Sequence, residues 1–213
     1  MYKSPFKFIA IEGNIGSGKT SLATKIAREY NARLILEQFE DNSFLPKFYV
    51  EPDRYAFPLE LSFLAERYQQ LKDHLSSQDI FKDFTISDYF INKSLIFSRK
   101  TLQTEEYKLY HRLFEIISQM LPRPDLLVYL YSSIERLQAN IKKRDRSYEQ
   151  NIQDEYLQSI QESYFDFIRQ QKDMRILIID TNELDFVGKE EDYRKIVTEI
   201  FKERPIGVHR IHF

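Results

Sequence analysis

The segment Gly13-Asn14-Ile15-Gly16-Ser17-Gly18-Lys19-Thr20 combines residue types and spacing that suit phosphate binding. It fits the P-loop pattern G-x-x-x-x-G-K-[ST]. Glycines let the backbone turn so that successive N–H groups point at phosphate oxygens, and a helix starting near Lys19 adds its positive dipole end. Lys19 offers a point charge to the β- and γ-phosphates, and Thr20 offers a hydroxyl to Mg²⁺. The loop therefore predicts a site for the triphosphate tail of a nucleotide.

The context of this loop supports the same interpretation. The apolar run Lys7–Glu12 precedes it and predicts a strand, while Ser21–Tyr30 follows with Leu22, Ile26 and Tyr30 four residues apart, which is typical of a helix. A strand before the loop and a helix after it are what the motif requires.

Strand-like and helix-like segments alternate along the rest of the chain, which favours a parallel sheet. We expect an α/β fold of three layers, α/β/α, with a five-stranded parallel sheet: the fold of P-loop-containing nucleoside triphosphate hydrolases. The expected strands are Lys7–Glu12, Arg33–Leu36, Phe84–Ser87, Leu126–Tyr131 and Ile176–Ile179. The other expected helices are Leu59–Leu75, Thr101–Leu121, a helix capped by Ser133, Gln153–Gln171 and Glu190–Phe201, with a loop-rich segment Glu40–Tyr55 and an aperiodic tail Lys202–Phe213.

Acidic residues follow three of the expected strands. Glu37, Asp88 and Asp180 come where their strands end. In open α/β sheets, ligands bind at the carboxyl edge of the strands. These carboxylates are therefore candidates for work beside the phosphate loop.

Composition restricts the class of protein further. The chain has 213 residues, no cysteine and a formal net charge of −2. We expect a single domain over residues 1–213, no disulfide and no broad nucleic-acid surface. No run of about 18 apolar residues exists and the start Met1–Pro5 is no secretory signal, so we expect no membrane span and a cytoplasmic location.

A P-loop alone does not choose among kinases, GTPases and motor ATPases. A guanine-reading N-K-x-D is absent, because Asn92-Lys93-Ser94-Leu95 lacks the aspartate. The D-x-x-G at Asp185–Gly188 comes too late for a switch. The expected strand Leu126–Tyr131 is followed by serines, whereas the corresponding strand of a remodelling ATPase usually ends in acidic residues. A small-molecule kinase fits best.

The order of motifs resembles the deoxynucleoside kinases, the group related to deoxyguanosine, deoxyadenosine and deoxycytidine kinases. The similarity runs from about Phe8 to Ile200. Five stretches carry it: Gly13–Ser21; Leu36-Glu37-Gln38-Phe39; Tyr55-Ala56-Phe57-Pro58-Leu59-Glu60; Arg144–Gln150 followed by Tyr156-Leu157; and Asp180–Phe186.

The resemblance implies roles around the transferred phosphoryl group. Glu37 matches the family's general base, which accepts the proton of the sugar 5′-hydroxyl. Arg144 and Arg146 match lid arginines in a lid at about residues 140–152, where guanidinium groups suit the charge on phosphate oxygens. The family usually has another arginine one turn earlier, and this chain has Asn140 there.

The resemblance also implies contacts to the rest of the two substrates. Tyr49 and Glu149 match residues that hold the sugar 3′-hydroxyl, and Phe97 is a candidate for stacking on the base. The loop containing Glu183, Asp185 and Phe186 matches the one that wraps the adenine of ATP. Asp88, with Thr20, is the expected Mg²⁺ ligand.

Two positions depart from the family. Tyr89 follows Asp88 where the family usually has an arginine near the base, so another residue must supply that charge; Lys93 and Arg99 are the candidates. Glu60 stands where the family often has a base-reading glutamine. An ionised carboxylate offers only acceptors and suits the adjacent N1–H and 2-amino donors of guanine, which favours a purine, with deoxyguanosine slightly ahead of deoxyadenosine. Alternatively, Glu60 pairs with Arg67 or Arg54.

The sequence thus predicts ATP- and Mg²⁺-dependent phosphorylation of a deoxynucleoside, by a protein that works as a homodimer without nucleic acid or membrane. Two alternatives stay open. A nucleoside-monophosphate kinase would use arginines such as Arg54, Arg67 and Arg99 to hold the acceptor's phosphate. A regulatory module would bind the nucleotide without transferring phosphate.

Overall fold

The computed structural model describes residues 4–38, 42–76 and 79–213, which divide into two compact units. Of the described residues, the sheet unit comprises 4–36, 79–90 and 123–213, and the helical unit comprises 37–38, 42–76 and 91–122. Phe39 and Glu40, which belong to segments quoted above, lie outside the described residues. Within the described part, no helix is both long and apolar enough to cross a membrane.

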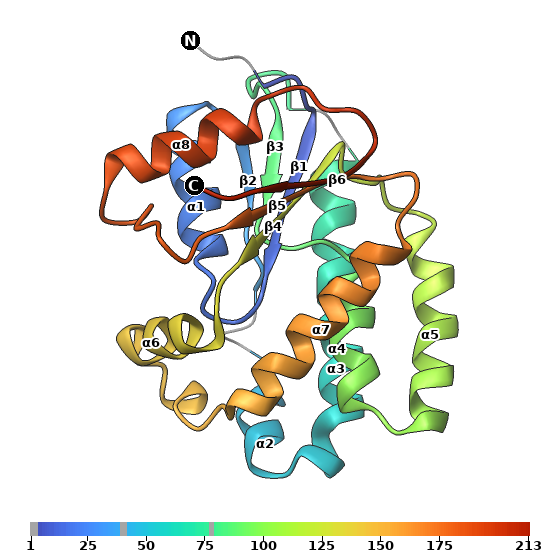
Figure 1. Ribbon diagram of the computed structural model, residues 1–213. Coiled ribbons are helices and arrows are strands. Elements are labelled where there is room, and N and C mark those ends of the chain that lie inside the picture. Colours follow the sequence, from blue (N-terminus) through green and yellow to red (C-terminus); the bar gives the residue numbers. More distant parts are fainter. Residues whose placement is uncertain (1–3, 39–41, 77–78) are drawn as a thin grey trace. The chain divides into compact units, whose positions relative to one another are not determined.

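The sheet unit is built on a parallel sheet of six strands in the order β2-β3-β1-β4-β5-β6 (Figure 1). The strands β1 and β4 lie at its centre because they are apolar and almost wholly buried. The strands are β1 Phe8–Gly13, β2 Arg33–Ile35, β3 Thr85–Ser87, β4 Leu126–Tyr131, β5 Arg175–Asp180 and β6 Gly207–Ile211.

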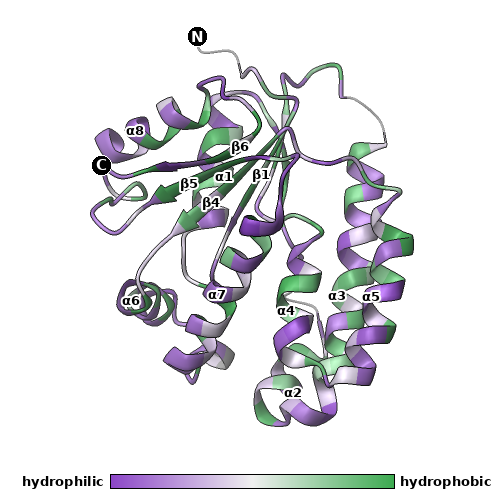
Figure 2. Ribbon diagram, turned by 45° about the vertical axis from the view of Figure 1, so that its right-hand side comes forward, coloured by the Kyte–Doolittle hydropathy of each residue, from purple (hydrophilic) through white to green (hydrophobic). Residues whose placement is uncertain are grey.

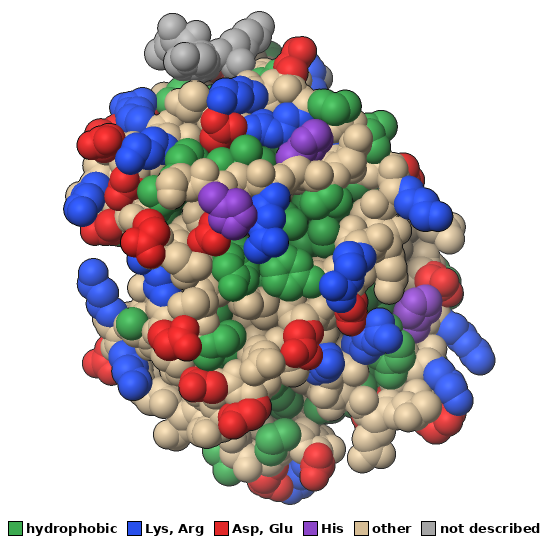
Figure 3. All heavy atoms as spheres, in the orientation of Figure 1, with side chains coloured by type: hydrophobic (Ala, Val, Ile, Leu, Met, Phe, Trp, Pro, Cys, Tyr) green, Lys and Arg blue, Asp and Glu red, His purple; other side chains and the backbone are tan. Residues whose placement is uncertain are grey.

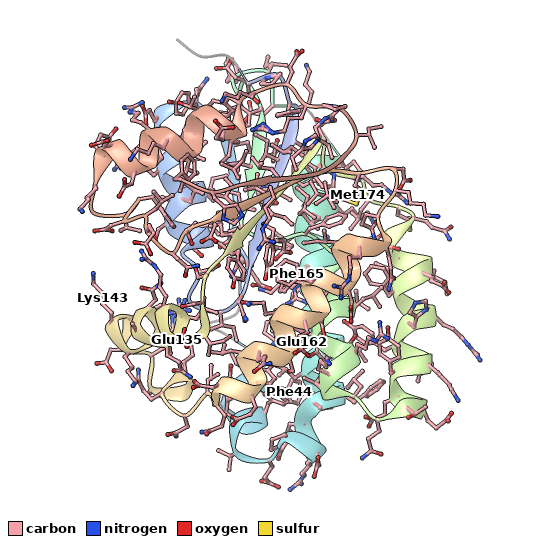
Figure 4. All side chains as sticks on the ribbon, viewed as in Figure 1. Phe44, Glu135, Lys143, Glu162, Phe165 and Met174 are labelled. Atoms are coloured by element: carbon pink, nitrogen blue, oxygen red, sulfur yellow. The ribbon has the colours of Figure 1, made fainter. Side chains whose placement is uncertain are left out.

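Helices cover both faces of this sheet, as the three-layer expectation requires (Figure 1). Side chains of α1 and α8 pack on the face that carries Ile9 and Val128. The opposite face meets α7, whose Phe165 stacks edge-on against Tyr129 (Figure 4). The helices of this unit are α1 Lys19–Glu29, α6 Ile134–Arg144, α7 Asp154–Gln170 and α8 Glu190–Ile200.

In the described part of the helical unit, α3 packs against α2, α4 and α5. Figure 2 shows apolar and polar residues alternating around α3 and α5, as expected of helices buried on one side. The bounds are α2 Leu45–Val50, α3 Pro52–Leu75, α4 Lys93–Thr101 and α5 Thr104–Ser118.

The expected strands and most helices are confirmed, but the five-strand prediction is wrong because β6 pairs with β5 in the tail. This edge strand has partly exposed residues on both faces, so no apolar run marked it. Segment Glu40–Tyr55 is not a plain loop, since it contains α2 and the start of α3. Helix α3 continues through Pro58, which sequence rules treat as a helix boundary.

The helix expected over Thr101–Leu121 is confirmed as α5, but it is shorter than expected, because it runs only over Thr104–Ser118. The structure has α4 ending at Thr101 and α5 beginning at Thr104, with a capping box between Gln103 and Glu106. Helix α4 was missed because the face it buries carries Lys93, Ser94 and Ser98. A buried polar face gives no apolar periodicity to detect.

Charged side chains are spread over the molecular surface. On the face seen in Figure 3, Lys and Arg side chains are interspersed with Asp and Glu side chains. This mixture agrees with the formal net charge of −2.

Candidate active site

The glycine loop joins β1 to α1 in a conformation that needs its glycines. Gly16 and Gly18 have φ angles of 82° and 86°, in the region that side chains rarely adopt. A Cβ atom on Gly18 would lie 2.7 Å from Cζ of Phe186, and one on Gly16 would lie 2.8 Å from the carbonyl oxygen of Leu137. The glycine loop thus packs closely against Phe186 and the backbone of α6.

Side chains within the loop hold its shape and leave a polar group available. Asn14 donates from Nδ2 to the carbonyl oxygen of Leu157 over 2.7 Å, and Lys19 donates to the carbonyl oxygen of Asn14 over 2.8 Å. The hydroxyl oxygen of Ser17 is buried and has no hydrogen-bond partner among the described residues. A buried hydroxyl without a partner is costly, and a phosphate oxygen would satisfy it.

A cavity of about 400 Å³ opens beside this loop in the sheet unit. Figure 4 labels Lys143, which lines it from α6. The volume is in the range of small-molecule sites. Of the expected nucleotide-binding residues, Gly13, Asn14, Ile15 and Glu183 are not in the lining. The residues that line the cavity are Gly16–Ser21, Ser132, Arg136, Asn140, Lys143, Arg144, Arg146, Thr181, Leu184, Asp185, Phe186 and Val187.

Thr20 and Asp88 meet at the edge of the sheet. The Thr20 hydroxyl donates to Oδ2 of Asp88 over 2.5 Å. The buried carboxylate of Glu12 supports this region, because it accepts from the N–H of Phe90 over 2.7 Å and from the Tyr164 hydroxyl over 2.8 Å. Sequence analysis did not identify Glu12 as a site residue. A charged residue at the end of an apolar strand is the pattern that could have indicated it.

The two arginines expected in a lid contact one carboxylate. Arg144 and Arg146 both form ion pairs with Glu149, whose side chain is only 7% exposed. Both arginines also line the cavity. Asn140, which stands where the family usually has a further arginine, donates to the carbonyl oxygen of Gly16 over 2.8 Å and so ties α6 to the glycine loop.

Arg136 is a cation at this cavity that sequence reasoning missed. It lies one turn before Asn140 on α6 and donates to the carbonyl oxygens of Asn182 and Leu184. It therefore joins α6 to the loop that carries Asp185 and Phe186. Its position, one turn before the expected arginine on the same helix, is the signal that reveals it.

The helical unit gathers a second set of charges around Glu37. Arg67 donates from Nε over 2.8 Å and from its terminal nitrogen over 2.7 Å to Oε1 of Glu37, and Lys93 contacts Oε2. Burial alone would raise the pKa of Glu37. The charges and hydrogen bonds of Lys93 and Arg67 outweigh it and lower the pKa to about 2.

Glu60 belongs to the same cluster but has a different environment. It is 4% exposed, and its Oε1 accepts from the Thr101 hydroxyl over 2.9 Å. Burial raises the pKa of Glu60 to about 7, against the lowering effects of the Arg67 charge and the Thr101 hydrogen bond. Arg67 lies two helical turns beyond Glu60, so the i, i+7 spacing places both on one face of α3.

The remaining candidates are placed as follows. Tyr49 is half-buried against the small apolar cluster of Phe48, Ala56 and Leu59. The ring of Phe97 lies 5.5 Å from Nζ of Lys93. Of the alternative cations, Arg54 pairs with Glu51 at the surface and Arg99 is exposed. Asp180, at the end of β5, accepts from Asn182 and pairs with His212.

Comparisons with known proteins place this arrangement in a family. A family model described as deoxynucleoside kinase matches residues 9–204. A deoxyguanosine kinase of Bacillus subtilis (strain 168) is 35% identical over 199 residues, which cover 91% of this chain and 95% of that protein. A deoxyadenosine kinase of Dictyostelium discoideum is 32% identical over 192 residues, covering 90% of this chain and 78% of that protein.

Solved structures agree with this assignment. A deoxyadenosine kinase from M. mycoides, with the products dCMP and a flexible dCDP bound, superposes with a TM-score of 0.78 at 25% identity, covering 91% of this chain and 98% of that one. The resemblance noted in the sequence is therefore confirmed, and a regulatory module without transfer activity is not favoured. The chain belongs to the deoxynucleoside kinase family and is a phosphotransferase.

Proposed function

We propose that this enzyme transfers the γ-phosphoryl group of ATP to the 5′-hydroxyl of a purine deoxynucleoside, giving the 5′-monophosphate for nucleotide salvage. One observation carries the proposal: the chain pairs a phosphate loop and its basic cavity with a buried carboxylate, Glu37, that two cations keep ionised. The names of the relatives, deoxyguanosine kinase and deoxyadenosine kinase, support the acceptor class.

The donor is assigned to the cavity of the sheet unit. Backbone N–H groups of Gly13–Ser21, the Lys19 ammonium and the Ser17 hydroxyl would bind the phosphates, and Arg144 and Arg146 would stabilise the charge on the moving group. The loop with Glu183, Asp185 and Phe186 would hold the adenine; Glu183 is exposed and outside the cavity lining, so its backbone would make the contact.

The pair Thr20 and Asp88 fits a magnesium site. A hydroxyl and a carboxylate are hard oxygen ligands, and Mg²⁺ in phosphotransferases takes only one or two protein ligands together with substrate phosphates. When bound there, Mg²⁺ would neutralise part of the phosphate charge. Asp88 and Thr20 already lie within hydrogen-bond distance, so little rearrangement would be needed to share an ion.

The acceptor is assigned to the helical unit, with Glu37 as the base. As the 5′-oxygen bonds to the γ-phosphorus, the bond from that phosphorus to the β–γ bridging oxygen breaks, ADP leaves, and Glu37 takes the hydroxyl proton. Tyr49 and Glu149 would hold the 3′-hydroxyl, and Phe97 would stack on the base. Glu37 lies in the helical unit and Lys19 in the sheet unit.

Glu60 is the proposed reader of the base. Its ionised form offers two acceptors, which suit the N1–H and 2-amino donors of guanine, whereas its protonated form offers one donor and one acceptor, which suit adenine. With a pKa of about 7, both forms are present near neutral pH. The two forms of Glu60 suit the two purines, which weakens the expected advantage of deoxyguanosine over deoxyadenosine.

A nucleoside-monophosphate kinase is disfavoured by where its required cations lie. Arg67 is 4% exposed and is bound to Glu37, while Arg54 and Arg99 lie at the surface. A second phosphate in the helical unit would have to displace Arg67 from Glu37, and the loss of a cation is costly for a buried carboxylate.

We further propose that residues 140–152 act as a lid within one catalytic domain and that the enzyme is a homodimer. Helices α3 and α5 and the turn after α5 expose Leu61, Leu109, Ile116 and Met120, at 36%, 50%, 67% and 65%. Apolar residues on two packed helices would suit a second copy of the chain. Light scattering at micromolar concentration tests this, and a monomer mass contradicts it.

The direct test of the function is a phosphoryl-transfer panel. The four deoxynucleosides and their monophosphates are offered as acceptors, with ATP and GTP as donors and with Mg²⁺ present or chelated. We expect transfer to deoxyguanosine and deoxyadenosine from ATP with Mg²⁺. Transfer only to monophosphates would support the alternative kinase, and a clear preference for pyrimidines would remove the purine assignment.

A further inference from the structure

The family resemblance implies a cation beside Glu37 that the residue after Asp88 does not supply. That residue is Tyr89, whose fully buried ring carries no charge. Of the two candidates from the sequence, Arg99 is exposed on α4, whereas Lys93 contacts Oε2 of Glu37. The structure thus distinguishes between the two candidates, and it adds Arg67 as a second cation on the same carboxylate.

Arg67 is held in place on every side. Its side chain is 5% exposed, two of its nitrogens bind Oε1 of Glu37, and a third donates to the Ser94 hydroxyl over 2.8 Å. Its guanidinium also lies 4.8 Å from the ring centroid of Phe63. A planar group with this many fixed partners orients Glu37 and has little freedom to move.

Lys93 has a different character. It is the first residue of α4, its side chain is 11% exposed, and its ammonium contacts Oε2 of Glu37 beside the ring of Phe97. The lysine ammonium is a point charge on a flexible side chain. It can therefore leave a partner more easily than the Arg67 guanidinium, which is held by several hydrogen bonds at once. Oε2 is therefore the oxygen of Glu37 whose cation can be exchanged.

We propose, on the basis of the proposed function, that Lys93 is a positioning residue that replaces the missing arginine: Arg67 fixes Glu37 through Oε1, and Lys93 holds Oε2 until the acceptor's 5′-hydroxyl takes its place. The proton of that hydroxyl then passes to Oε2. While both cations are in contact, Glu37 is too weak a base for this transfer at neutral pH, and withdrawal of Lys93 strengthens it.

Other ionisable groups near Glu37 also influence its pKa and the pKa values of its partners. The acids oppose one another's ionisation, and the cations favour it. The groups that act on Glu37 or on its partners are Glu60, Glu66 and Arg67 on α3, Lys93 on α4 and Tyr110 on α5. None of these is altered in the variants below except Lys93 itself.

The test compares Lys93→Met, Lys93→Arg and the control Lys100→Met, an exposed lysine on the same helix. We expect Lys93→Met to lower kcat by about 100-fold, with the KM for the deoxynucleoside within about threefold, because Oε2 of Glu37 is no longer positioned for the 5′-hydroxyl while the contacts that bind the nucleoside remain. The acidic limb of its kcat/KM profile should move up by at least about one pH unit, since Glu37 loses a cation. Lys93→Arg should recover kcat to within about tenfold of the parent, and Lys100→Met should match the parent.

A Lys93→Met enzyme whose kcat and pH profile superpose on those of the parent overturns the proposal, and so does a loss confined to KM. Melting curves check the fold; if Lys93→Met is unfolded, Lys93→Gln, which keeps a donor without the charge, takes its place. Titration of the Glu37 carboxyl by carbon-13 NMR gives a readout without turnover: its pKa should be higher in the variant. If the parent phosphorylates no deoxynucleoside, the proposed function fails, while an unchanged Glu37 titration contradicts the role of Lys93 separately.

Discussion

The two units hold their charges in opposite ways. In the sheet unit, the described cavity lining carries five cations, of which Arg144 and Arg146 share the buried acid Glu149. The acid in the lining itself is Asp185, and the cations are Lys19, Arg136, Lys143, Arg144 and Arg146. In the helical unit, Arg67 and Lys93 are buried on Glu37. The first arrangement suits a multiply charged ligand such as a triphosphate, and the second suits a neutral ligand such as a nucleoside, because its buried cations already have a carboxylate as their partner.

Removal of the central carboxylate of the helical unit should have the largest effect. Glu37→Gln keeps the shape of the side chain but cannot take the hydroxyl proton, so we expect kcat to fall by roughly two to four orders of magnitude with similar substrate binding. Rapid-quench assays of single turnovers measure the chemical step directly.

The control for this change is Glu105→Gln, an acid on α5 whose side chain is 84% exposed. It should leave kcat unchanged. Because Glu37→Gln leaves Arg67 and Lys93 facing a neutral group, circular dichroism must establish that the variant is folded. A folded Glu37→Gln enzyme with near-parental kcat would show that Glu37 is not the base.

The sheet unit should be most sensitive in its backbone. Gly18→Ala forces a side chain onto a φ of 86° and places its Cβ 2.7 Å from the Phe186 ring. We expect the KM for the donor to rise by about 100-fold, since strain of this kind costs about 1–3 kcal/mol and the ring must also move. Steady-state kinetics with ATP as the varied substrate measure this.

Gly207→Ala is the matched control, because Gly207 has a φ of 131° and nothing within 4 Å of the added Cβ. It should lower the melting temperature without changing the KM for ATP. An equal rise in KM in both variants would mean that general destabilisation, rather than the shape of the phosphate loop, causes the effect.

This contrast also explains what the sequence could reveal. The phosphate loop, its strand and its helix are contiguous in the chain. Residues Gly13–Thr20 therefore predict both the local fold and phosphate binding. The cap at Ser133 is equally local, and the structure confirms that its hydroxyl accepts from the N–H of Arg136. Local rules are reliable where the partners are neighbours in the chain.

The helical unit could not be predicted in the same way. The cluster on Glu37 draws Arg67 from α3 and Lys93 from α4, which are 30 and 56 residues away in sequence. Helix α4 itself escaped detection because it buries Lys93 and Ser94, and β6 escaped because pairing with β5, not its own composition, makes it a strand. Contacts between distant parts of the chain determine α4, β6 and the cluster on Glu37, and a single sequence does not reveal such contacts.

Substitution of Arg136 tests nucleotide binding by the sheet unit, with a smaller expected effect than Gly18→Ala. Its guanidinium joins α6 to the carbonyl oxygens of Asn182 and Leu184, so Arg136→Gln should loosen the loop proposed to hold the adenine. We expect the KM for ATP to rise by about 30-fold with kcat within a few-fold, a loss in the range of two charge-assisted hydrogen bonds. If kcat falls instead while the KM is unchanged, Arg136 acts on the transferring phosphoryl group.

The smallest expected effect separates the two carboxylates of the helical unit. Glu37, with both cations, stays ionised across the working range, whereas Glu60, with a pKa of about 7, is mostly protonated at pH 6 and mostly ionised at pH 8. Protonated Glu60 suits adenine and ionised Glu60 suits guanine. The ratio of kcat/KM for deoxyguanosine to that for deoxyadenosine should therefore increase with pH, by roughly tenfold over these two units.

Glu60→Gln is the decisive variant for this prediction. Its amide offers one donor and one acceptor at every pH, so the ratio should become independent of pH and shift toward deoxyadenosine. Competition assays with both nucleosides in one reaction measure the ratio without errors in enzyme concentration. A parental ratio that stays flat from pH 6 to pH 8, or a Glu60→Gln enzyme that keeps the slope, would mean that Glu60 does not read the base and that its proton serves only the packing of α3 against Thr101.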